Sequence, residues 1–273
     1  MKPRVLILYY SFTNQTRRVA EAMSEVLGEL DCEVEECAVE FIDEQYHLQL
    51  ADKPQLLRTI MSLLPAQLRG KTGRIRVPDE VLKRDYDLIC IGSPTWWFFP
   101  AMPIVSFLES EGAKQLLENK RFAVFAVCRA IWWHNLRQVK RMAQKQGGTF
   151  VDGAAFCFDG GYVRSELSFI SYLKNDADLG RFWGFKIYKF GVSDEGIAKA
   201  KEFAQGLGRG LLGTISSLAS HSTTAQPPEE YFQNGLGKIA QCRLSTSGNE
   251  LRGSDFVAPD PFVGAKEPSR LPS

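Results

Sequence analysis

The stretch "VLILYYSFTNQT", residues Val5 to Thr16, changes character within a few positions. An apolar run from Val5 to Tyr9 gives way to small hydroxyl and amide side chains, and apolar residues then recur at helical spacing after Thr16. A buried strand, a polar turn and an amphipathic helix are typical of the first unit of a parallel sheet flanked by helices. We therefore expect an α/β fold that begins at this stretch.

The same alternation of apolar runs and helical patterns continues along the chain. Further strands are expected at residues 32–39, in "YDLICIGSP" (86–94), in "RFAVFAVC" (121–128) and in "TFVDGAAFCF" (149–158). Helices are expected at residues 17–30, about 104–118, 136–146 and 193–212, and residues 55–68 are helix-like but interrupted by prolines. Five strand and helix units of this kind predict a doubly wound parallel sheet.

Residues 1–219 are expected to form one domain, with insertions at about 40–80 and 159–192. The second insertion contains "RFWGFKIYKFGV", residues 181–192, which could add an edge strand, a lid, a dimer surface or an extra packed layer. From residue 220 to 273 the composition shifts to Ser, Thr, Pro, Gly and charge. Such a segment buries too little apolar surface to offset the entropy of ordering, so we expect a disordered tail.

Composition narrows the class of partner. The chain has 273 residues, 44% of them hydrophobic, and Lys+Arg (33) nearly cancel Asp+Glu (32) to a formal charge of +1. The chain therefore has no large net positive charge that would attract it to nucleic acid or to an anionic membrane, and a small-molecule partner is expected. We expect neither a signal peptide nor a membrane span, because the first apolar run ends at Ser11.

The six cysteines are scattered, without a C-x-x-C pair or a paired His cluster. This pattern favours free thiols in a reducing compartment over disulfides or a metal site. A cytoplasmic location without a metal is the expectation.

The polar turn after the first strand is a candidate anion site. It would place residues 11–16 at the carboxyl edge of the sheet and at the positive end of the first helix, with hydroxyl and amide donors from Ser11, Thr13, Asn14, Gln15 and Thr16. The stretch contains neither G-x-x-x-x-G-K-[ST] nor G-x-G-x-x-G, so a monophosphate fits better than a triphosphate or pyrophosphate. Plain helix capping by the same residue types is the alternative.

Two aromatic segments follow later strands. "GSPTWWFFPAMPIVSFLE" (92–109) is expected to turn at Gly92, Ser93 and Pro94 and then carries four consecutive aromatic residues, which no strand or helix period can direct into one core. "CRAIWWHN" (128–135) carries a second aromatic pair, Trp132 and Trp133. Such residues can stack on a planar ring, or they can pack as a hydrophobic loop on the inserted segment.

The motif "YYSFTNQT" followed by "RRVAEAM" resembles the phosphate-binding turn of the flavodoxin-like family, T/S-x-T-G-x-T, with Asn14 in place of the usual Gly. Asn tolerates a positive φ, so the turn can be kept. The segment at 92–109 is similar to the loop that wraps the isoalloxazine ring in flavodoxin-fold NAD(P)H:quinone and FMN-dependent reductases. The resemblance implies a five-stranded sheet of order 2-1-3-4-5 and FMN as cofactor.

Carried over, the resemblance implies ring contacts from Pro94, Thr95, Trp96, Trp97 and Phe98. The loop after the fourth strand, with Cys128, Arg129, Trp132 and Trp133, would cover the other face of the ring. Arg129 and His134 are the candidates for a catalytic role, each with a surface or capping role as the alternative. Asp159, Gly160, Gly161 and Tyr162 would lie at the same edge of the sheet.

The function implied is an FMN-dependent oxidoreductase that passes electrons from NAD(P)H through FMN to a small conjugated acceptor such as a quinone. Reductases of this type are often homodimers. A flavodoxin-type electron-transfer protein and a biosynthetic flavin-dependent oxidase or aromatase are the alternatives. The nearly neutral charge favours the enzyme, because electron-carrier flavodoxins are typically strongly acidic.

Overall fold

The computed structural model describes residues 2–46, 48, 53–129, 131–158, 168, 171, 181–182, 185–186 and 190–220. Within these, residues 53–55, 57, 181–182, 185–186 and 214–220 are described by their secondary structure alone. The chain divides into two units, Met1–Gln241 and Cys242–Ser273, and every described residue belongs to the first. The expected tail beyond Ser220 therefore lies outside the described residues.

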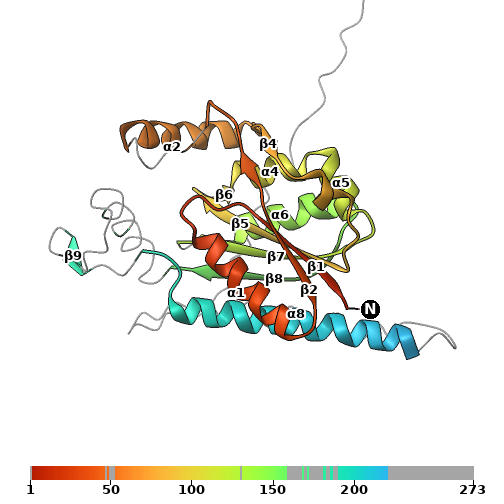
Figure 1. Ribbon diagram of the computed structural model, residues 1–273. Coiled ribbons are helices and arrows are strands. Elements are labelled where there is room, and N and C mark those ends of the chain that lie inside the picture. The colour runs from red at the N-terminus through yellow and green to blue at the C-terminus, as the bar shows by residue number, and fades with distance from the viewer. Residues whose placement is uncertain are drawn as a thin grey trace, which may run out of the picture. The chain divides into compact units, whose positions relative to one another are not determined.

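The centre of the fold is a parallel sheet in the order β2-β1-β5-β7-β8. Its strands are β1 (Arg4–Tyr9), β2 (Glu33–Ala38), β5 (Leu88–Trp96), β7 (Arg121–Cys128) and β8 (Thr149–Cys157). Counted along the chain these parallel strands have the order 2-1-3-4-5, which is the flavodoxin-like arrangement. The predicted fold class is confirmed (Figure 1).

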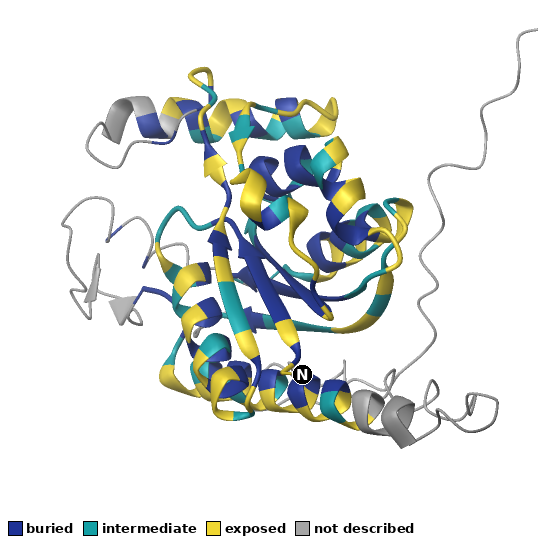
Figure 2. Cartoon of the chain, turned by 45° about the vertical axis from the view of Figure 1, so that its right-hand side comes forward, coloured by how far each residue is buried: buried dark blue, intermediate teal, exposed yellow. Residues whose placement is uncertain are grey.

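Helices cover both faces of this sheet. Figure 1 shows α1 (Gln15–Glu29) and α8 (Asp194–Ser220) on one side, and α4 (Met102–Leu108), α5 (Glu111–Leu117) and α6 (Trp133–Lys145) on the other. The alternating side chains of β1, β5 and β7 point into two separate cores, one beneath each layer of helices. The central strands are dark with burial in Figure 2, whereas the outer strands and the helices carry exposed residues. A continuous apolar run, buried on both faces, is what such central strands require.

The segment between β2 and β5 adds smaller elements. β3 (Glu40–Phe41) pairs antiparallel with β4 (Ile75–Arg76), and α2 (Lys53–Leu68) and α3 (Asp79–Lys83) complete the segment. Leu56, Leu63 and Val81 join the core on the α4 to α6 side of the sheet. Among the described residues, no helix combines the length and the apolarity needed to cross a membrane.

Two expectations about local structure are wrong. Gly92, Ser93 and Pro94 do not form a turn: β5 continues through them to Trp96 and pairs with β7 as far as the contact of Pro94 with Val127. Strand β6 (Phe99–Pro100) then pairs antiparallel with β5 and forms a hairpin, and the Pro94 carbonyl accepts a hydrogen bond from the Ala101 N–H at 3.0 Å. Gly92 is needed in this strand because a Cβ would lie 2.2 Å from the Phe125 ring.

The single helix expected at about 104–118 is also divided in two. α4 ends at Leu108, and Ser110 begins α5 by accepting a hydrogen bond from the Ala113 N–H at 3.3 Å. A serine that caps a helix in this way favours a new start over continuation.

An edge strand was one of the possibilities for the aromatic segment of the second insertion. Its described pieces, β9 (Arg181–Phe182) and β10 (Phe185–Lys186), pair with each other and not with the central sheet. Val192 makes an antiparallel bridge to Phe158 just past the end of β8.

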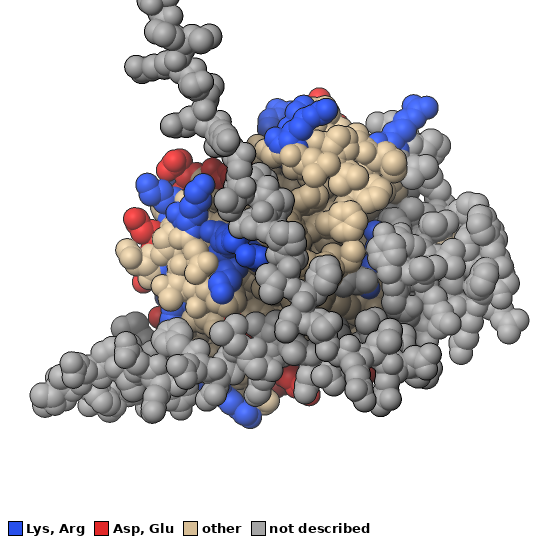
Figure 3. Space-filling view, turned by 180° about the vertical axis from the view of Figure 1, so that it is seen from behind, with Lys and Arg blue, Asp and Glu red and all other residues tan. Residues whose placement is uncertain are grey.

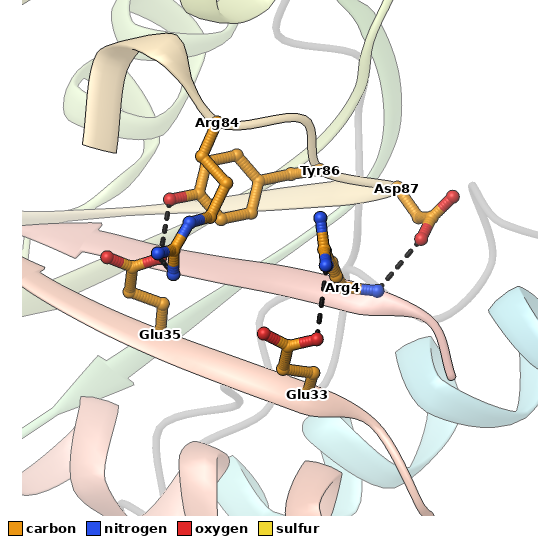
Figure 4. A network of polar contacts seen from close by, with 6 residues as sticks. All are labelled: Arg4, Glu33, Glu35, Arg84, Tyr86 and Asp87. Carbon is orange, nitrogen blue, oxygen red and sulfur yellow. Dashed lines mark hydrogen bonds and ion pairs between the residues drawn. The ribbon is translucent and has the colours of Figure 1, made fainter. Parts of the chain in front are cut away.

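A polar network ties β1, β2 and the start of β5 together at the amino-terminal edge of the sheet (Figure 4). Glu35 accepts hydrogen bonds from the Tyr86 hydroxyl and from Arg84, each at 2.7 Å. Arg4 contacts Glu33 through its side chain at 3.1 Å and Asp87 through its backbone N–H at 2.8 Å. Burial, together with the bond to Glu35, raises the pKa of Tyr86 above its usual range.

Candidate functional site

The carboxyl ends of β1 and β5 form a topological switch point. The two strands are neighbours in the sheet, yet α1 follows β1 onto one face, and α4 follows β5 and β6 onto the opposite face. In open α/β sheets a crevice opens between two such connections, and ligands bind there. The polar turn from Tyr10 to Asn14 lies at this point, where the Tyr10 N–H donates to the Gly92 carbonyl at 3.3 Å.

The turn has the backbone that the sequence predicts. Asn14 precedes α1 with φ 58° and ψ 4°, in the left-handed region, and its side chain makes no capping hydrogen bond. Ser11 Oγ accepts from the Arg17 N–H at 3.2 Å, so a serine hydroxyl caps one amide of the first turn from outside the helix. The first turn contains no acidic side chain that would repel an anion from the positive helix end. This combination of donors and helix end suits a small anion.

The side chains of this turn differ in their exposure to solvent. Ser11 and Thr13 are partly exposed, Asn14 is exposed, and Thr16 is buried. The Gln15 amide is engaged elsewhere: its Oε1 accepts from the Val192 N–H at 3.0 Å and from Arg18 at 3.3 Å. Gln15 thus joins the start of α1 to the segment that precedes α8.

The indoles of the β5–β6 hairpin pack on the rest of the protein. Trp96 lies edge-to-face against Tyr10 (centroids 5.5 Å apart) and Phe41 (6.4 Å). Trp97 donates its Nε1–H to the Ile60 carbonyl of α2 at 3.0 Å. The alternative of a hydrophobic loop packed on the inserted segment therefore describes these two residues.

Other aromatic residues of these loops remain accessible. Phe98 and Trp133 are 41% and 59% exposed, and Trp132 is partly buried against the core. His134 lies edge-to-face against Phe99, with the centroids 4.9 Å apart. The aromatic surface at this edge is thus formed by the hairpin tip and by the start of α6.

Asn135 is a structural residue that the sequence did not single out. It is fully buried, and its Nδ2 donates to Thr95 Oγ1 at 2.8 Å and to the Ser93 carbonyl at 3.2 Å. Its Oδ1 has no hydrogen-bond partner among the described residues. Asn135 fixes the end of β5 to the first turn of α6. The sequence signal that could have pointed to this residue was its position directly after "IWWH".

The loop after β7 lies beside the end of β8. Cys128 Sγ is 3.2 Å from Cys157 Sγ, and Arg129 is partly buried. The predicted contributors Asp159, Gly160, Gly161 and Tyr162 lie outside the described residues, as does Ala130. In the part of the chain that the structure describes, His, Cys, Asp and Glu side chains do not gather in groups of three or more that could hold a metal ion.

Charged side chains are mixed in sign on the described surface. On the face seen in Figure 3, basic side chains form separate groups with acidic side chains beside some of them. Arg17 and Arg18 at the start of α1 are themselves paired, Arg17 with Glu21 at 2.8 Å and Arg18 with Asp194 at 4.0 Å.

No protein-family model and no curated protein matches the chain. Among solved structures, a flavoprotein in complex with FMN from Lactobacillus acidophilus NCFM is 24% identical over 56% of this chain and 92% of its own, with a TM-score of 0.43. A flavodoxin from the domain Archaea is 13% identical over 76% of this chain and 98% of its own (TM-score 0.43). A WrbA-like flavodoxin from Agrobacterium tumefaciens is 15% identical over 78% of this chain and 99% of its own (TM-score 0.42). The strand order β2-β1-β5-β7-β8 gives the chain the flavodoxin-like fold.

Proposed function

We propose that the chain is an FMN-dependent oxidoreductase whose cofactor binds at the carboxyl edge of the sheet, within residues 1–219. The observation that carries the proposal is the polar, acid-free turn at the switch point between β1 and β5. In sheets of this strand order ligands bind at that switch point, and in flavodoxin the ligand there is FMN.

The donors of the turn fit a terminal monophosphate. The hydroxyls of Ser11, Thr13 and Thr16, the Asn14 amide and the first N–H groups of α1 supply neutral donors at the positive end of a helix. Gln15 supports this cradle by holding the segment before α8 against it. A phosphate held in this way orients the rest of the cofactor toward the neighbouring strand ends.

In this proposal the isoalloxazine ring lies against the ends of β5 and β7. Pro94, Thr95 and Phe98 would contact it from the hairpin, and Cys128, Arg129, Trp132 and Trp133 from the second loop. Trp96 and Trp97 support the hairpin from behind through their contacts with Tyr10, Phe41 and Ile60. The aromatic side chains exclude water from the ring.

FMN supplies the electron-transfer chemistry, while the protein binds, orients and tunes it. Arg129 is the proposed cation beside the polar end of the ring, and His134 is the second candidate for a direct role. We take NAD(P)H as the electron donor and a small conjugated molecule such as a quinone as the acceptor. The nearly neutral charge of the chain supports a small-molecule acceptor over a basic protein partner.

The proposal is tested by titrating the purified full-length chain with FMN and recording the absorption and fluorescence spectra. Saturable binding with quenched flavin fluorescence is expected. Anaerobic mixing of the complex with NADPH or NADH should then bleach the visible flavin absorption, and addition of a quinone should restore it. Failure to bind FMN at any concentration would contradict the proposal.

An electron-transfer protein that acts between protein partners is the second candidate. The exposed Trp133 and Phe98 at the mouth of the site favour it, because they would offer apolar surface to a docking protein. This candidate predicts FMN binding with reduction by dithionite but not by NADPH or NADH. The two functions are therefore separated by one anaerobic experiment.

A further inference from the structure

Two cysteine side chains from neighbouring strands meet at the end of the sheet. The parallel register of β7 and β8 places Cys128 opposite Cys157, each the last residue of its strand, and their Sγ atoms are 3.2 Å apart. The Phe158 N–H donates to the Cys128 carbonyl at 2.9 Å and so continues the ladder past the pair. The backbone therefore holds the two residues opposite each other on both sides of the contact.

This arrangement is compatible with a disulfide. Neighbouring strands lie about 4.7–4.9 Å apart, and the Cα atoms of disulfides are usually about 4.4–6.8 Å apart. Side chains alternate along a strand, so Cys128 shares a face with Ala126, and Cys157 shares it with Ala155, which is Ala126's partner in the ladder. The side chains that precede the pair on this face are thus small, and the two Sγ atoms already lie 3.2 Å apart.

The other described thiols are differently placed. Cys90 is fully buried in the core, and burial raises its pKa to about 12; burial likewise raises the pKa of Cys37 to about 11. A thiol with so high a pKa is protonated near neutral pH and reacts slowly. Cys128 is 4% exposed, but Cys157 is partly exposed and gives a reagent access to the pair.

We propose that Cys128 and Cys157 form a dithiol–disulfide redox pair that exchanges with small disulfides of the glutathione class. The Cys157 thiolate attacks one sulfur of the small disulfide and releases the other half as a thiolate. The Cys128 thiolate then attacks the Cys157 sulfur of the mixed disulfide and releases the second half. The two protein thiols lose two protons and two electrons, and the small disulfide becomes two thiols.

The two cysteines lie at the carboxyl ends of β7 and β8, just before the loop that begins at Arg129. They are therefore at the same edge of the sheet as the candidate site. The inference does not depend on flavin binding, and it is tested on the protein without added FMN.

The experiment equilibrates the reduced full-length chain with glutathione buffers from fully reduced to fully oxidised. The thiols that remain are then trapped by alkylation after acid quenching, and the peptides are analysed by mass spectrometry. We expect a cross-linked peptide pair that contains Cys128 and Cys157, formed and lost reversibly across the series. Absence of that cross-link in the oxidised buffer, or only glutathione adducts on these residues, would overturn the proposal.

Variants identify the partners. Cys128→Ser and Cys157→Ser should each abolish the cross-link, and Cys157 should retain a glutathione adduct in the first of them. Cys32→Ser is the matched control, because Cys32 precedes β2 at the amino-terminal end of the sheet, and it should leave the cross-link unchanged. The main result is read on the wild-type chain, so a variant that fails to fold does not remove the test. Preferential cross-linking of either residue to another cysteine would contradict the assignment.

Discussion

Asn14 and Trp97 have positive φ at the edge of the sheet that holds the candidate site, with φ 58° at both positions. The two residues differ in how they tolerate this backbone. Asn is among the residues that visit the left-handed region most readily, whereas a bulky side chain there is a backbone outlier. Trp97 is the first residue of the two-residue β5–β6 turn, a position where glycine is preferred in type II′ turns, and its bond to the Ile60 carbonyl helps to hold it there.

Substitution of Asn14 tests whether the turn depends on backbone freedom. Asn14→Ala should lower the free energy of unfolding by about 1 kcal/mol, because Ala resists the left-handed region, whereas Asn14→Gly should change it by only about a few tenths of a kcal/mol. Urea denaturation measures both changes. Asn119, with φ 59° in a loop at the other edge of the sheet, is the matched control and should give the same pattern. Equal stability of Asn14→Ala and wild type would contradict the interpretation.

At the scale of elements, α1 and the segment before α8 are joined at Gln15. Arg18 donates to the Val192 carbonyl at 3.2 Å, parallel to the bond from the Val192 N–H to Gln15. Gly191 has φ +119°, and a Cβ there would lie 2.3 Å from the Gln15 Oε1. The positive φ therefore favours glycine at this junction, and a Cβ there would also displace the end of the Gln15 side chain.

Two substitutions at this junction should be non-additive. Gln15→Ala should cost about 1 kcal/mol of unfolding free energy from lost hydrogen bonds, and Gly191→Ala about 1–2 kcal/mol from strain and overlap. Together they should cost less than their sum, because removal of the Gln15 side chain relieves the overlap. Denaturant unfolding of the four proteins gives the coupling energy.

Gly206→Ala is the control for these glycine effects, because no atom lies within 4 Å of a Cβ at that position of α8. It should stabilise the protein by up to about 1 kcal/mol. Strict additivity of Gln15→Ala and Gly191→Ala would show that the two side chains do not meet.

The elements that could be predicted from the sequence are those with strong local patterns. The apolar runs of β1, β5, β7 and β8 and the helical spacing of α1 and α8 are sufficient to place them and to give the fold class. Residues 92–94 belong to the strand expected at 86–94, but the turn also expected there is wrong. A Gly-Ser-Pro sequence locally favours a turn, whereas the pairing of residues 92–94 with β7, and of Thr95 and Trp96 with β6, decides the outcome. β7 is distant in sequence, and β6 pairs with β5 only once the hairpin has formed. Neither partner can therefore be predicted from the local propensity of these residues.

The candidate site was predictable in part for the same reason. The polar turn and the positive φ tolerated by Asn14 follow from a short motif that lies next to a clear strand and helix. The roles of the four consecutive aromatics were not predictable, because Trp96 and Trp97 are oriented by Phe41 and α2, which belong to an insertion without a clear pattern. The contribution of Asn135 depends on a buried contact across two elements.

At the scale of the whole described unit, the two edges of the sheet differ in chemistry. The amino-terminal edge carries the network of Arg4, Glu33, Glu35, Arg84 and Tyr86 (Figure 4). The carboxyl edge carries hydroxyls, aromatics and a helix start. The polar contacts at the amino-terminal edge join β1, β2 and the segment before β5, whereas the first turn of α1 at the carboxyl edge has no acidic side chain. The alkaline pH dependence of stability is expected to report in part on Tyr86 in this network.

Tyr86 predicts a loss of stability at alkaline pH. Its folded-state pKa is raised by burial and by the bond to Glu35, so its contribution is complete below the unfolded pKa of about 10 and is lost as pH rises above that value. Tyr86→Phe should cost about 1 kcal/mol near neutral pH and should flatten the alkaline decline. Burial also raises the pKa of Tyr10. Because Tyr10 is still present in the Tyr86→Phe variant, part of the alkaline loss of stability should remain. Urea denaturation across the alkaline range checks this, and parallel profiles for the two proteins would refute it.

The most direct test of the central claim compares the affinities of FMN and riboflavin, which differ only in the phosphate. If the phosphate binds at residues 11–16, the wild-type chain should bind FMN more tightly by about 2 kcal/mol or more, about 30-fold in Kd, because charge-assisted hydrogen bonds are lost with riboflavin. Thr13→Ala combined with Thr16→Ala should remove most of this difference, whereas Thr149→Ala at the opposite edge of the sheet should keep it. Equal affinities for the two flavins in the wild-type chain, or an undiminished preference for FMN in the double variant, would contradict the account.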